Sequence, residues 1–138
     1  MYKNIYTKIM PIIFKKNDDI LIVKPHGKMS KEDLITYSLT FEYYLDNFEM
    51  FKGIYDLRDM DDAPIGLLGG LSSFMKKIRP KTKEKISCNI IIVNRSIIKN
   101  FLNMLFTVIE PASPYHIIDN IKDIQPLLND KQNLFIKD

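Results

Sequence analysis

Short apolar runs alternate along this chain with longer segments whose apolar residues recur at steps of three and four. The runs cover residues 5–14, 20–24, 51–57, 88–93 and 115–118. Short runs between turn residues are typical of β strands, and the longer periodic segments are typical of amphipathic helices. The predicted order is therefore β-β-α-β-α-β-α-β-α. This order indicates an α/β fold with a mixed, mostly parallel five-stranded sheet and helices packed on it.

The first two strands are expected to pair as an antiparallel hairpin at the edge of the sheet. The turn-like segment Lys16-Asn-Asp-Asp19 separates them, and Gly27 ends the second strand. The run 88–93 is apolar almost throughout. Such a run is expected of a central strand that is covered on both faces.

The first expected helix begins after Ser30. Asp33 stands three residues further on, which is the spacing of a capping box. One buried stripe is predicted from the residues that recur at steps of three and four: Leu34, Ser38, Phe41, Leu45 and Phe48.

Prolines mark the expected limits of the next two helices. The second helix begins near Pro64 and ends before Pro80, and the third carries its apolar stripe through 97–108 and ends before Pro111. Gly69 and Gly70, inside the second helix, indicate either close packing against a neighbour or a flexible segment that faces a partner.

A final helix is expected to be capped by Asp119 or Asp123 and to run to Leu128, with Pro126 in its first turn. The tail 131–138 contains an apolar Leu-Phe-Ile. It is expected to add an edge strand or to pack on the surface.

The 138 residues are expected to form a single domain over 1–138, with a core at about 5–129 and a C-terminal tail at 130–138. Apolar residues make up 46% of the chain, enough for a globular core. The net charge of +3 is too small to indicate nucleic-acid binding, and no aromatic residues interleave with the basic ones.

The single cysteine, Cys88, excludes an intramolecular disulfide and is expected to be a small buried hydrophobe. The first residues lack the long apolar stretch of a signal peptide, and no run approaches the about 20 residues of a membrane span. A cytoplasmic location without stable membrane insertion is expected.

Two segments, Gly27-Lys-Met-Ser-Lys-Glu-Asp33 and Ile54-Tyr-Asp-Leu-Arg-Asp59, resemble segments of the STAS domains, the fold of the sporulation anti-anti-sigma factor SpoIIAA. Gly27-Lys-Met-Ser-Lys-Glu-Asp33 is similar to the Gly-Lys-(apolar)-Thr-Lys-Glu-Asp turn of the SpoIIAA-like family, also grouped as STAS/SEC14-type proteins. Ile54-Tyr-Asp-Leu-Arg-Asp59 is similar to the strand ending in Asp-Leu before that family's second helix. The resemblance covers about 17–129. It implies a SpoIIAA-like fold and a non-enzymatic regulatory or protein-interaction role.

One departure from the family pattern concerns phosphorylation. Anti-sigma antagonists carry a phosphorylated Ser within Asp-Ser-Ser-Gly at the start of the second helix. The corresponding stretch here is Asp61-Asp-Ala-Pro-Ile-Gly66, without Ser or Thr, while Ser72 and Ser73 lie well inside the helix. A Ser-phosphorylated switch is therefore not expected.

The end of the third strand is the predicted partner-binding surface, because ligands and partners of open α/β sheets dock at the carboxyl ends of strands. Its residues are Asp56, Arg58, Asp59, Met60, Asp61, Asp62, Ile65 and Leu68. Met60, Ile65 and Leu68 are expected to supply exposed apolar atoms. The partner is a second protein or a second copy of this chain.

The charged residues of this surface allow other roles. The aspartates are interpreted either as a cluster for a hard cation such as Mg²⁺ or as loop residues that cap the second helix. Arg58 either pairs with Asp56 or Asp59, or receives an anionic ligand. No metal or other cofactor is predicted.

A basic run follows the second helix pattern: Lys76, Lys77, Arg79, Lys81, Lys83 and Lys85. It is interpreted as a surface for anionic lipid headgroups or an acidic protein, or as a solvated loop. Because the family is also grouped with SEC14-type proteins, the resemblance implies an alternative function, that of a carrier of a small apolar ligand or a lipid.

No catalytic motif is recognisable. His26 and His116 have no neighbouring metal-ligating residues, and neither a nucleophile elbow nor a zinc-hydrolase motif is present. The glycine pair fits neither a P-loop nor a dinucleotide-binding fingerprint. These absences favour a protein that is not an enzyme.

Overall fold

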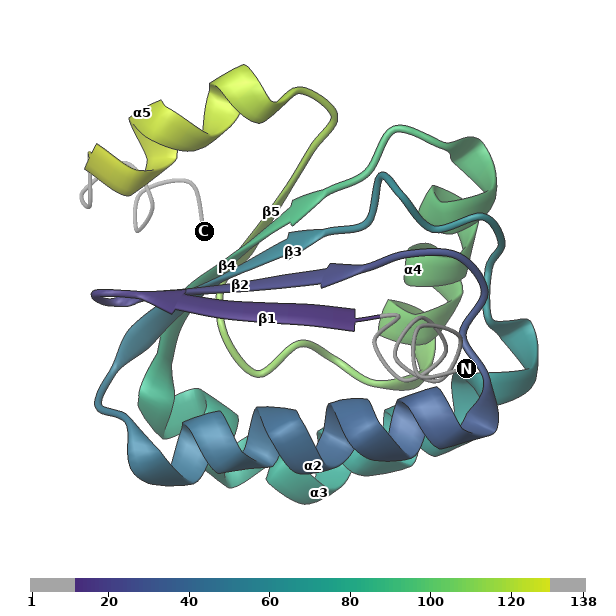
Figure 1. Cartoon of the computed structure of the whole chain (residues 1–138), viewed down its shortest axis with the longest axis horizontal. Helices are drawn as coiled ribbons and strands as arrows, with labels where there is room; N and C mark the ends of the chain where they lie inside the picture. Colours follow the sequence, from purple (N-terminus) through teal and green to yellow (C-terminus); the bar gives the residue numbers. More distant parts are fainter. Residues whose placement is uncertain (1–11, 130–138) are drawn as a thin grey trace, which may run out of the picture.

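The computed structural model describes residues 12–129 and places five strands in one sheet, in the order β1-β2-β3-β4-β5 (Figure 1). The strands are β1 Ile12–Asn17, β2 Ile20–Pro25, β3 Phe51–Asp56, β4 Ile86–Ile92 and β5 Tyr115–Ile118. β1 and β2 are antiparallel, and the other neighbours are parallel. The predicted sheet is therefore confirmed. The start of the first apolar run and the tail 131–138 lie outside the described residues.

Four α-helices connect and cover these strands: α2 Lys31–Asn47, α3 Leu68–Lys85, α4 Ser96–Val108 and α5 Ile124–Asn129. Short 3₁₀ turns, η1 Ile65–Leu67 and η2 Ile121–Asp123, precede α3 and α5. Successive right-handed crossovers in one direction put their helices on one face of a sheet. Accordingly α2, α3 and α4 share one side, and α5 lies on the other (Figure 1).

The side chains of each strand alternate between these two faces. Tyr55 and Ile91, paired across β3 and β4, pack with residues of α3 and α4. Ile54 and Ile90, one position earlier in each strand, pack with Leu127 of α5. Cys88 lies in this second cluster, so the prediction that it is a buried hydrophobe is confirmed.

The start of α2 forms as the sequence predicts. The backbone amide of Asp33 donates to Ser30 Oγ at 3.1 Å, and the Ser30 amide donates to Asp33 Oδ2 at 2.7 Å. This capping box satisfies two amide groups at the helix N-terminus. Phe41 and Leu45 of the predicted stripe are buried against the sheet.

Gly70 brings α3 close to α2. A Cβ atom at this position would lie 3.0 Å from Leu34 Cδ2, whereas one at Gly69 would meet open space. Close packing is thus confirmed for Gly70 and is not seen at Gly69.

The expected end of the second helix before Pro80 is wrong, because α3 continues through Pro80 to Lys85. Proline leaves the carbonyl four residues earlier, that of Lys76, without its usual donor. Both residues are exposed, so water can satisfy that carbonyl. Ile78 is buried in the core and β4 begins directly after the helix, so tertiary packing overrides the proline signal.

The residue that caps the start of the last helical segment also differs from the prediction. Asn120 Oδ1 accepts a hydrogen bond from the backbone amide of Lys122 at 3.0 Å, so Asn120 caps η2 instead of Asp119 or Asp123. The amide is two residues away, the spacing of an Asx turn. Across residues 12–129, no helix offers an apolar stretch long enough to cross a membrane.

Candidate functional site

An ion pair closes the end of β3. Arg58 donates to both carboxylate oxygens of Asp56, from Nε at 2.8 Å and from Nη2 at 2.7 Å. Lys24 Nζ lies 3.2 Å from Asp59 and 3.8 Å from Asp56. The hydrogen bond from Arg58 is the main reason why the pKa of the buried Asp56 carboxyl lies below its usual value. The predicted local pairing of Arg58 is confirmed.

The chain then passes close to Gly27. The Gly27 amide donates to the Asp59 carbonyl at 3.0 Å, and the Asp61 amide donates to the Gly27 carbonyl at 3.0 Å. Gly27 has φ +72°, a conformation that glycine adopts without strain. Met60, held between these bonds, turns its side chain inward and is only 4% exposed. The expectation that Met60 supplies exposed apolar atoms is therefore wrong.

The residues that follow Met60 are more open. Asp61 and Asp62 are exposed, Ile65 is 58% exposed, and Leu68 is half-buried against the core. Asp62 Oδ1 accepts from the neighbouring Ala63 amide at 2.9 Å.

The acidic residues do not cap the helix. Neither η1 nor α3 has a side-chain cap, so that interpretation is wrong. The residue before each of these helices is Pro64 or Leu67, which has no side-chain acceptor. Within the described residues, no three acidic, histidine or cysteine side chains are placed to hold a metal ion.

The basic run belongs to α3, so its interpretation as a solvated loop is wrong. Lys77 and Lys81 pair with Glu42 of α2, and Lys81 also pairs with Asp46. Two others bind backbone carbonyls: Lys85 that of Phe48, and Arg79 that of Glu110. Lys76 and Lys83 are exposed. Most of these cations therefore hold the helix in place.

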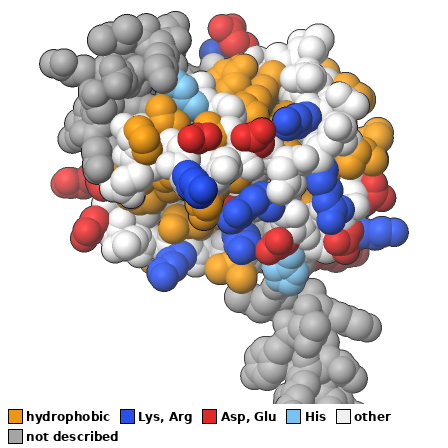
Figure 2. All heavy atoms as spheres, turned by 90° about the horizontal axis from the view of Figure 1, so that it is seen from above, with side chains coloured by type: hydrophobic (Ala, Val, Ile, Leu, Met, Phe, Trp, Pro, Cys, Tyr) orange, Lys and Arg blue, Asp and Glu red, His pale blue; other side chains and the backbone are white. Residues whose placement is uncertain are grey.

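Charge of both signs also covers the opposite side of the molecule. Figure 2 shows the face that carries α5, where basic and acidic side chains are intermixed among apolar ones. The described surface on this face has no broad patch of a single sign.

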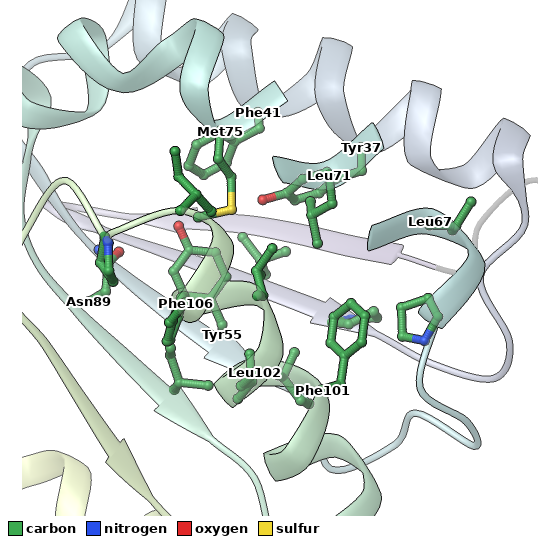
Figure 3. A pocket seen from close by; sticks show the side chains of 18 of the residues that line it. Tyr37, Phe41, Tyr55, Leu67, Leu71, Met75, Asn89, Phe101, Leu102 and Phe106 are labelled. Carbon is green, nitrogen blue, oxygen red and sulfur yellow. The ribbon is translucent and has the colours of Figure 1, made fainter. Parts of the chain in front are cut away.

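A cavity of about 190 Å³ lies between the sheet and helices α2, α3 and α4 (Figure 3). We call it the helix-side cavity. Its wall is formed mainly by Tyr37, Phe41, Tyr55, Leu71, Met75, Asn89, Phe101, Leu102 and Phe106, with further apolar residues at both ends. Neither Asp56 nor Arg58 lines it. Met60 of the predicted partner-binding surface does line it, so the cavity adjoins that surface.

Polar groups of Tyr37, Tyr55 and Asn89 border this apolar space. The hydroxyl groups of Tyr37 and Tyr55 point into it, and Asn89 lies at one side (Figure 3). Burial raises the pKa of both phenols, and that of Tyr55 is raised further by its proximity to Tyr37. Both phenols are therefore neutral near pH 7. Asn89 Oδ1 is buried and accepts no hydrogen bond from any described residue.

Gly53 makes room for the Asn89 side chain. The two residues are neighbours across β3 and β4, and a Cβ atom at Gly53 would lie 2.6 Å from Asn89 Oδ1. Sequence reasoning assigned neither Asn89 nor Gly53 to a site. The one available signal was that Asn89 interrupts an otherwise apolar run.

The comparisons with known proteins identify the fold. No protein-family model matches the chain, and no curated protein matches it. A crystal structure of an uncharacterised DUF3478-family protein with a SpoIIAA-like fold, from Shewanella loihica PV-4, matches with TM-score 0.57 and 15% identity. The match covers 85% of this chain and 91% of the other.

An anti-sigma factor antagonist from Mycobacterium paratuberculosis matches with TM-score 0.54 and 12% identity, over 86% of this chain and 93% of the other. The chain therefore has the SpoIIAA-like α/β fold that its sequence predicts. At these identities the likeness establishes the fold alone.

Proposed function

We propose that this protein is a non-enzymatic regulatory module that acts by binding a protein partner. The fold supports this role, because one protein that shares it is an anti-sigma factor antagonist. The observation that carries the proposal is the exposure of Ile65 beside the acidic pair Asp61 and Asp62. Residues 59–68, which contain all three, form the docking segment.

The first half of the docking segment is held by contacts within the protein, and the segment also carries exposed side chains. The Asp56–Arg58 pair and the backbone bonds to Gly27 fix its first half. The described residues provide no ion pair for Asp61 or Asp62, and Ile65, which follows shortly after them in the chain, offers an exposed apolar side chain. The complementary partner surface is apolar at its centre and basic at its edge.

Serine phosphorylation is not part of this proposal. The stretch 61–66 contains neither Ser nor Thr. Partner binding is therefore expected to be the same before and after treatment with a serine/threonine kinase or phosphatase.

The test is retrieval of a partner by the tagged full chain and by two variants. Ile65→Asp places a charge in the docking segment. Ile121→Asp is the control, because Ile121 is 50% exposed on η2, an element on the α5 side of the sheet. We expect the control to retain the partner and Ile65→Asp to lose at least about tenfold in affinity. A chain that stays monomeric and retrieves nothing, or equal retrieval by both variants, would refute the proposal.

Binding of a small apolar ligand is a second candidate function, and the helix-side cavity favours it. The lipid-carrier form of this idea has less support, because most of the basic residues expected to meet headgroups are held in contacts within the protein. Native mass spectrometry of the purified chain tests for a retained small molecule.

A further inference from the structure

We propose that the helix-side cavity binds a neutral aromatic compound of one or two rings that carries an N–H or O–H donor. This proposal deepens the second candidate function and rests on it. It combines the size of the cavity, its aromatic wall and the buried acceptor Asn89 Oδ1.

The volume sets the size of the ligand. An apolar protein cavity of about 150 Å³ is sufficient to bind benzene, whereas drug-sized ligands occupy about 300–1,000 Å³. The helix-side cavity, at about 190 Å³, lies near the lower figure. It has room for a substituted single ring or a fused pair of small rings, and it is too small for a lipid with two acyl chains.

The wall favours an aromatic ligand over an aliphatic one. Rings of Tyr37 and Phe41 stack with centroids 5.6 Å apart, and those of Phe106 and Tyr115 lie 5.0 Å apart. All four line the cavity. Aromatic rings gain from offset or edge contacts with one another, and thioethers such as that of Met75 add further favourable contacts.

Asn89 Oδ1 selects a ligand that donates a hydrogen bond. A buried acceptor without a partner is unfavourable, and a donor brought by the ligand removes that penalty. Gly53 leaves room for this oxygen beside the cavity wall, because a Cβ atom there would lie 2.6 Å from it. The neutral hydroxyls of Tyr37 and Tyr55 can then bond other polar atoms of the same ligand.

The charges around the cavity favour a neutral ligand. Arg79 and Glu110 are the charged residues in the lining. Glu110 is exposed and its carbonyl accepts from Arg79, so both stand at the rim, beside segment 109–112. A charged compound would lose its hydration inside without gaining an opposite charge.

The experiment measures binding of phenol, indole, toluene, cyclohexanol and decanoic acid by calorimetry to the full chain and to two variants. We expect phenol and indole to bind, and phenol to bind several-fold more tightly than cyclohexanol. Asn89→Leu removes the acceptor at similar volume. It is expected to lower phenol affinity about tenfold while toluene affinity does not fall. Leu71→Phe places a larger side chain in the cavity wall, and we expect its ring to fill the space and abolish binding of phenol, indole and toluene.

The outcomes distinguish failure of the aromatic-ligand inference from failure of the second candidate function, binding of a small apolar ligand. If no compound binds a folded protein, both the inference and the second candidate function fail. If decanoic acid binds and the ring compounds do not, the inference fails and apolar ligand binding stands. If Asn89→Leu changes phenol and toluene affinity equally, the role of Asn89 is refuted. The melting transition of each variant shows that it is folded.

Discussion

Replacing Asn89 by Leu should make the protein more stable. Asn89 Oδ1 is buried without a partner among residues 12–129. An unsatisfied buried polar group costs about 1–3 kcal/mol, and leucine has a similar volume and suits the apolar wall. We therefore expect the free energy of unfolding of Asn89→Leu to exceed that of the wild type by about 1–2 kcal/mol.

Denaturant unfolding measures this change. The midpoint should rise while the slope m stays constant, which shows that the stability itself has changed. Thermal unfolding should give a melting temperature higher by about 3–8 °C. Asn94→Leu is the matched control, because Asn94 is exposed in the loop between β4 and α4, and its effect should stay within about 0.5 kcal/mol. A loss of more than about 1 kcal/mol in Asn89→Leu would refute the reasoning, since it would show that Asn89 makes a stabilising hydrogen bond.

Three further predictions concern the scaffold, and each is measured by denaturant unfolding. Ser30→Ala removes the acceptor of the Asp33 amide and should lower the free energy of unfolding by about 1 kcal/mol; no change would contradict the capping box. Arg58→Gln should be less stable at neutral pH, because it raises the depressed pKa of Asp56. This deficit should shrink as the pH falls below the ordinary pKa of an aspartate, about 3.9, and then through the lower pKa of Asp56 in the folded protein; a pH-independent deficit would contradict the linkage. Gly69→Ala should gain about 0.5 kcal/mol, since its Cβ meets open space in α3, and a loss would show a contact there.

The sequence was sufficient to predict the order of elements, because each depends on local patterns. The capping box at Ser30 and the limits of β5 were predicted correctly. The mostly parallel sheet with an antiparallel hairpin at its edge was also predicted, from the alternation of strands and helices. These features depend on residues that are near one another in the chain.

Features that depend on distant contacts were not predicted. The sequence predicts that the second helix ends before Pro80. Because Ile78 is buried in the core, α3 continues beyond this proline. Met60 looked available for a partner, but its backbone is held beside Gly27, far away in the sequence. The helix-side cavity depends on how three helices pack on the sheet. No local pattern measures the space that they leave.

The central claim is that this space is open and binds a small ring. A crystal soaked with 4-iodophenol tests it directly, because the anomalous signal of iodine locates the ligand. The account predicts a peak inside the helix-side cavity, with the phenol hydroxyl within hydrogen-bond distance, about 2.7–3.2 Å, of Asn89 Oδ1. A cavity closed by Leu71 and Met75, with no iodine between the sheet and the helices, would contradict it.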